Sequence, residues 1–110
     1  MMRLAGVSGA LAVGLGAYGA HGLKHLPPTY ADVYKTASLY HLLHSGVMLS
    51  SAMNLHGRKQ KIVCGLFGFG IVAFSGSCYL VAIMQHRSYG QLAPFGGASL
   101  IAGWLAIAFL

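Results

Sequence analysis

The chain has 110 residues, of which 56% are hydrophobic and only 7% are Asp, Glu, Lys or Arg. So few charged residues cannot cover the surface of a soluble domain of this size, so the composition predicts an integral membrane protein in contact with the lipid bilayer. The net charge of +6 comes from seven Lys and Arg residues against a single acid, Asp32. These cations lie in loops and near helix ends rather than in one stripe, which argues against nucleic-acid binding and for contact with lipid headgroups.

Four stretches approach the roughly 20 apolar residues that span a hydrocarbon core of about 30 Å. They are residues 4–23, 36–55, 62–84 and 92–110. We therefore predict an all-α fold. A single transmembrane domain over residues 1–110 forms a four-helix bundle with both termini on the same side of the membrane.

The first stretch is rich in small residues that recur every four positions. One row contains Gly6, Ala10 and Gly14, and a second row contains Gly16 and Ala20. Such spacing allows another helix to approach closely, so these residues are predicted to mediate helix packing. A cleaved signal peptide is the alternative for this segment. We favour a membrane helix, because a discarded signal has no need of packing residues.

A new helix is expected after the sequence LPPTYADVYK. Pro27 and Pro28 stop any preceding helix, and Thr29 is placed to cap the next one. Asp32 completes a T-x-x-D pattern, where a carboxylate benefits from the free N–H groups of the first turn. Asp32 is the only acidic residue, and we favour a helix-capping role for it. The alternative is that it carries protons at the edge of the membrane.

The most basic loop is HGRKQK, residues 56–61, between the second and third spans. With four spans this loop shares a side with the N-terminus and Arg3. Three cations, Lys24, Lys35 and Arg87, lie on the opposite side together with Asp32. The positive-inside rule therefore places both termini on the cytoplasmic or matrix side.

Polar side chains of three spans are predicted to meet in one leaflet. In YHLLHS, His41 and His44 share one helix face, which should point into the bundle because a polar group facing lipid is costly. The candidate cluster consists of His21, His41, His44, Tyr18, Tyr40, Ser75, Ser77 and Tyr79.

Several interpretations of this cluster remain open. Hydrogen bonds between helices would fix the packing. Alternatively, the cluster binds haem, a quinone or a lipid in an apolar pocket, or relays protons. No metal site is predicted, because hard ions need carboxylates that the chain lacks. No catalytic residues are predicted either, since paired carboxylates, a G-x-S-x-G elbow and a phosphate-binding loop are all missing, and we do not expect an enzyme.

Five motifs occur in a fixed order. They are GAYGAH at 16–21, YHLLHS at 40–45, FSGSCYL at 74–80, LAPFGG at 92–97 and GW at 103–104. With these motifs the chain resembles the transmembrane protein 256 family, the eukaryotic branch of the bacterial domain-of-unknown-function 423 family of small inner-membrane proteins. The resemblance implies a protein of the mitochondrial inner membrane without established catalytic residues or cofactors. Bacterial members often have Gln at the position of His41, so His44 and His21 are the better candidates for a shared role.

The leading functional hypothesis is therefore a structural or accessory role, in which small-residue faces dock against a larger inner-membrane assembly such as the respiratory chain. Binding of haem, quinone or lipid at the histidine cluster is the alternative. A transporter is disfavoured, because no carboxylate or cation lies within the predicted spans. The bacterial inner membrane or another cellular membrane is the alternative location.

Overall fold

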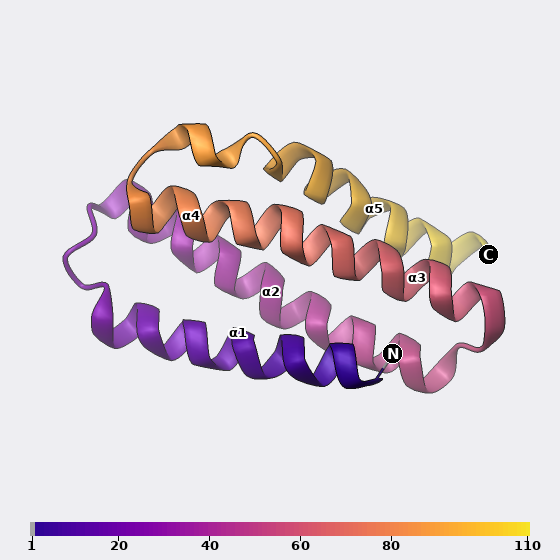
Figure 1. Cartoon of the computed structure of the whole chain (residues 1–110). Coiled ribbons are helices and arrows are strands. Elements are labelled where there is room, and N and C mark those ends of the chain that lie inside the picture. The colour runs from indigo at the N-terminus through magenta and orange to yellow at the C-terminus, as the bar shows by residue number, and fades with distance from the viewer. Residues whose placement is uncertain (1) are drawn as a thin grey trace.

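Long helices make up almost the whole chain in a computed structural model that describes residues 2–110. The third long helix is continuous through three elements: α3, the π-helical turn η1, and α4. In chain order the elements are α1 (Met2–Gly22), α2 (Pro28–Asn54), α3 (Gly57–Gly70), η1 (Ile71–Ser75), α4 (Gly76–Met84), the 3-10 helix η2 (Arg87–Gly90) and α5 (Ala93–Phe109). The described residues contain no strand, and both ends of the chain lie at the same end of the bundle (Figure 1). The all-α fold predicted from the sequence is confirmed.

The outer surface of the bundle is apolar. Val13, Val72 and Ile101 are 66%, 74% and 63% exposed. Within residues 2–110, Gly57–Met84 and Arg87–Phe109 are long and apolar enough to cross a membrane, with 28 and 23 residues. At ~1.5 Å per residue, the 21 residues of α1 and the 27 residues of α2 also reach the thickness of a hydrocarbon core. Such an apolar surface is stable in contact with the acyl chains of a lipid bilayer.

The central helix is α2, which separates α1 from the rest of the bundle (Figure 1). On one side α2 packs against α1, and on the other it packs against α3, η1 and α4. The last helix, α5, covers α3 and η1 from the far side. Because α2 is the only helix that packs extensively against α1, much of the surface of α1 has no neighbour within the chain.

The contact between α1 and α2 depends on small residues of α1. The hydroxyl of Tyr34 donates a hydrogen bond to the carbonyl of Leu15, and its ring occupies the space where a side chain at Gly19 would lie. Gly16 lies at the same contact, since a Cβ built there would be 3.3 Å from Ser38 Oγ.

The other row of small residues, Gly6, Ala10 and Gly14, is exposed, as is Ala20. No atom lies within 4 Å of a Cβ built on Gly6 or Gly14. Within the chain this row packs against no other helix, because α1 is rotated so that Ala5, Ser8, Ala12 and Gly16 face α2 instead.

The predicted capping pair at the start of α2 does not form. The helix begins at Pro28, and Pro27 occupies the cap position without a side-chain hydrogen bond. Proline suits the first helical position, because its missing N–H would have no partner there and its φ is already helical. Thr29 therefore lies inside the helix, and Asp32 lies beyond the first turn.

Replacing Thr29 by Ala is thus expected to change the free energy of unfolding by less than about 0.5 kcal/mol, whereas loss of a true N-cap costs about 1 kcal/mol. Thermal unfolding of the purified variant in detergent measures this difference. A loss near the full cap value would show that Thr29 does cap the helix in solution.

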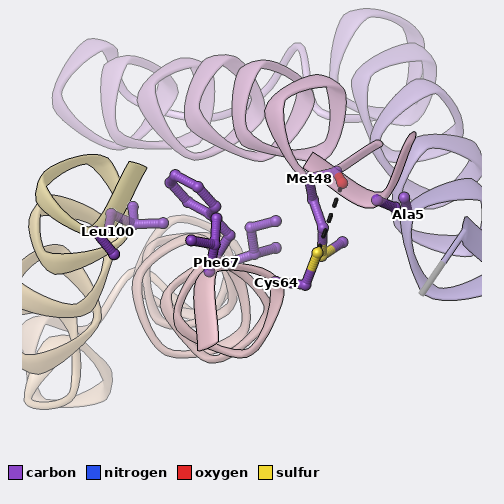
Figure 2. Packing of buried hydrophobic residues seen from close by; sticks show 9 residues of the cluster. Ala5, Met48, Cys64, Phe67 and Leu100 are labelled. Atoms are coloured by element: carbon purple, nitrogen blue, oxygen red, sulfur yellow. Dashed lines mark hydrogen bonds between the residues drawn. The ribbon is translucent and has the colours of Figure 1, made fainter. Parts of the chain in front are cut away.

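The buried core of the bundle is centred on α3. Phe67 is fully buried and packs with Leu100 of α5 and Met48 of α2 (Figure 2). The thiol of Cys64 contacts the Met48 carbonyl at 3.8 Å, and Ala5 of α1 closes the far side of this cluster (Figure 2). Cys64 and Cys78 are both free, in agreement with structural thiols on one helix.

The turn between α2 and α3 lies at the same end as both termini (Figure 1). Gly57 has a φ of +63°, a conformation that glycine adopts without strain. Just beyond it, the ammonium group of Lys59 donates a hydrogen bond of 3.2 Å to the carbonyl of Ile107 in the last turn of α5. A cation at this position also interacts favourably with the helix dipole. The basic turn is thereby tied to the C-terminal helix.

Candidate functional site

The polar side chains within the bundle form two hydrogen-bonded groups. The first surrounds His41, whose Nδ1 lies 3.0 Å from the hydroxyl of Tyr79 on α4. One turn further along α2, the hydroxyl of Ser45 donates to the His41 carbonyl at 2.6 Å. Ser8 of α1 then meets the Ser45 hydroxyl at 2.5 Å. This group links α1, α2 and α4.

The π-helical turn adds a second link to α2. Ser75, the last residue of η1, is 1% exposed and donates a hydrogen bond of 3.0 Å to the carbonyl of Ala37. Tyr79 follows Ser75 by four residues, so both side chains lie on the same face of the helix. Ser77 is also buried, on α4.

His44 is the centre of the second group. Its Nδ1 lies 2.8 Å from the carbonyl of Tyr40, and because a carbonyl only accepts, Nδ1 carries the hydrogen. Its Nε2 is then an acceptor, and it receives the indole N–H of Trp104 on α5 at 3.1 Å. Both ring nitrogens are therefore used in hydrogen bonds within the chain.

Aromatic rings surround His44 on three sides. The ring of Phe67 lies 5.7 Å away, that of Trp104 6.0 Å away at 74°, and that of Tyr40 5.7 Å away in a stacked arrangement. Phe67 and Trp104 also meet each other at 5.7 Å and 82°. These rings join α2, α3 and α5, so the second group fixes the half of the bundle that the first group does not reach.

His21 does not join either group. It is exposed near the end of α1, about 20 Å along that helix from Ser8, where the His41 group meets α1. The expected convergence fails because His21 lies in the last turn of α1, beside the loop, whereas His41 lies about 20 Å along α2 from its start at Pro28. Tyr18 is likewise on the surface, 51% exposed, and Tyr40 contributes only its ring and its carbonyl.

The sequence reasoning missed Trp104 as a member of the cluster. It is the only tryptophan of the chain and lies in the C-terminal half of α5, within an apolar stretch. An indole N–H within the bundle needs a hydrogen-bond acceptor, and this requirement could have identified Trp104 from the sequence. Ser8 and Ser45 were not identified as hydrogen-bond partners, because the spacing of small residues in α1 does not show which row faces α2.

A metal centre has no ligand set in the described part of the chain. Nowhere in residues 2–110 do three His, Cys, Asp or Glu side chains gather closely enough to hold an ion. His44 has no free nitrogen, and His41 is bonded to Tyr79. What these side chains do is join helices.

A cleft of about 690 Å³ opens beside the His41 group. Its walls are α1 and the helix formed by α3, η1 and α4, and α2 forms its floor. Most of the lining is apolar. The polar members are Ser8, His41, Ser75 and Tyr79.

Apolar outer surfaces, helices of membrane-spanning length and polar groups paired within the interior together define a helical integral membrane protein. The comparisons with known proteins agree. Residues 15–97 match the family described as "Protein of unknown function (DUF423)", and the chain belongs to this family.

Bacterial membrane proteins are among its relatives. The chain is 38% identical to the UPF0382 membrane protein YwdK of Bacillus subtilis and 37% identical to the UPF0382 membrane protein SSP2132 of Staphylococcus saprophyticus, over 94% of this chain and 89% of each relative. A UPF0382 membrane protein of Haemophilus influenzae is 31% identical over 98% of this chain and 90% of its own length. These names describe the relatives as membrane proteins and give no activity for them. No solved structure matches the chain significantly.

Proposed function

We propose that this protein is a structural, accessory component of a larger membrane assembly. The proposal rests on the observation that the buried polar groups form hydrogen bonds within the chain. His41, His44, Ser45 and Ser75 all take part in hydrogen bonds within the chain, which join the helices to one another. Groups engaged in this way hold a scaffold together, and the chain has almost no mass outside its helices.

The exposed row of α1 provides the surface for docking. Gly6, Ala10 and Gly14 lie on the side of α1 that no other helix of the chain covers. In lipid, association of helices depends on close packing, and small residues spaced by four permit it. The partner on this surface is a transmembrane helix of a larger membrane protein.

The location follows from the resemblance to the transmembrane protein 256 family, which implies the mitochondrial inner membrane and an assembly such as the respiratory chain. The named relatives are bacterial, so the inner membrane of a bacterium is the alternative. Arg3 and the basic turn at residues 56–61 lie at the end that holds both termini. The positive-inside rule orients this end towards the matrix or cytoplasm.

Blue-native electrophoresis of gently solubilised native membranes tests the proposal. The wild-type chain is expected to migrate with a large complex, whose other subunits mass spectrometry of the band identifies. Gly14→Leu should abolish most of this comigration, because the larger side chain keeps the partner helix at a distance.

Gly46→Leu is the matched control. Gly46 is an exposed helical glycine with no atom within 4 Å of a built Cβ, but it lies on α2. This variant should comigrate like the wild type. A wild-type chain that migrates alone, or equal comigration of all three chains, would exclude docking through α1.

A further inference from the structure

The cleft beside His41 has open space along both of its walls. Along α1 its lining runs from Leu4 to Leu15, a length of about 16 Å at ~1.5 Å per residue. The opposite wall contains Gly65, Gly68 and Gly76, and no atom lies within 4 Å of a Cβ built on Gly65 or Gly76. The volume of about 690 Å³ falls in the usual range of small-molecule sites.

The hydroxyl hydrogens of the two serines that line this cleft, Ser8 and Ser75, are already used in hydrogen bonds. Ser75 donates its hydrogen to the carbonyl of Ala37, and Ser45 donates its hydrogen to the carbonyl of His41. The hydroxyl of Ser45 has only one hydrogen, and it is donated to His41. In the contact of 2.5 Å between Ser8 and Ser45, the Ser8 hydroxyl is therefore the donor. Ser8 and Ser75 therefore present oxygen lone pairs to the cleft and no hydrogen.

Tyr79 and His41 share one hydrogen bond of 3.0 Å, between the tyrosine hydroxyl and Nδ1. The hydroxyl and a neutral imidazole carry one hydrogen each, and this bond uses one of them. Ser8 and Ser75 thus offer two acceptor oxygens in an otherwise apolar cleft, beside a His41–Tyr79 pair that retains one hydrogen.

We infer that the cleft binds a membrane-embedded alcohol, a molecule with a long apolar chain and a terminal hydroxyl group. The chain lies along the apolar walls of α1 and α3, and the hydroxyl donates its hydrogen to the acceptor oxygens of Ser8 or Ser75. A ketone or quinone head can only accept hydrogen bonds, so it would leave the oxygens of Ser8 and Ser75 without a donor. An apolar helix of a partner would also leave these oxygens unmatched, because its backbone N–H groups are used internally.

Competition binding on the purified full-length protein in nanodiscs tests this inference. Tritiated geranylgeraniol is the probe, and the competitors are unlabelled geranylgeraniol and its methyl ether, which has the same chain but no hydrogen to donate. One hydrogen bond of ordinary strength predicts that the alcohol competes at roughly 5- to 10-fold lower concentration than the ether. Ser8→Ala should reduce this preference, because it removes one of the acceptors.

Gly76→Leu separates the cleft from nonspecific binding. Gly76 follows Ser75, has ordinary helical φ and ψ, and faces open space, so Leu fills the cleft without a clash. Binding of geranylgeraniol should fall at least tenfold in this variant and stay unchanged in Gly46→Leu, while melting temperatures verify that both variants fold.

Equal competition by alcohol and ether, unchanged binding in Gly76→Leu, or no saturable binding in the wild type would each overturn the inference. The outcome is independent of docking through α1. Gly14→Leu should bind geranylgeraniol like the wild type, and Gly76→Leu should comigrate with the large complex.

Discussion

Replacing Gly96 by Ala is expected to destabilise the bundle by about 3 kcal/mol or more, the upper end of the usual cost of overpacking. Gly96 lies in the first turns of α5, where that helix crosses η1. A Cβ at this position would overlap the backbone nitrogen of Phe74 and lie 2.8 Å from Ala73 C and Phe74 Cα. These atoms belong to the backbone of a helix, so no side-chain rotation can make room and α5 must move away.

Gly97→Ala is the matched control, because it is the next residue of the same helix and undergoes the same chemical change. Its built Cβ meets only Phe74 Cδ2 at 3.8 Å, an ordinary contact. This variant should be as stable as the wild type or slightly more stable, since Ala is the better helix former. Circular dichroism during thermal unfolding in detergent measures both variants. Equal melting temperatures of the two would show that α5 does not approach η1 as closely as in the structure.

Hydropathy and proline positions were sufficient to predict the helices. The predicted span 62–84 lies inside the longer helix Gly57–Met84, and the span 36–55 lies inside α2 except for its last residue, Leu55. The differences are at the ends, because a helix continues past the apolar stretch while its backbone hydrogen bonds remain satisfied. The first residues of α2 and the basic residues of α3 are polar helical turns that a search for apolar residues passes over.

The rotation of α1 could not be predicted from the sequence. Two rows of small residues have the same four-residue spacing, and both are suited to close packing. The choice between them depends on residues far away in the chain, since Tyr34 needs the space at Gly19 and Ser45 needs the hydroxyl of Ser8. Spacing within one helix contains no information about such a partner.

The candidate site was predictable to the extent that it is local. The helical period of α2 places His41 and His44 on one buried face. In the structure, Ser75 of η1 and Tyr79 of α4 form hydrogen bonds to α2. The depth of the residues in the bundle was predicted wrongly, because His21 in the last turn of α1 was matched with His41, which lies nearly four turns into α2. The π-helical turn was not predicted either. It changes the phase of the helix, and it lies where Gly96 of α5 closely approaches the backbone of Ala73 and Phe74.

The pairing of His44 with Trp104 gives the second large effect. His44→Ala removes two hydrogen bonds and the ring that contacts Phe67 and Tyr40, and a loss of about 3 kcal/mol is expected from the cavity together with the unpaired indole. Trp104→Phe keeps an aromatic ring and removes only the donor, so its cost should be about 0.6 to 2 kcal/mol. His25→Ala is the control, since His25 is exposed in the loop between α1 and α2, and its melting temperature should not change.

A double-mutant cycle on the unfolding free energies distinguishes the hydrogen bond from the packing around it. If Trp104 acts through Nε2 of His44, the variant with both substitutions should lose less than the sum of the single losses, by about 1 kcal/mol. Simple additivity would mean that the indole N–H and Nε2 are not joined in the membrane. His44 would then have a free nitrogen in the interior of the bundle, and the cluster would be open to a ligand instead of serving the scaffold.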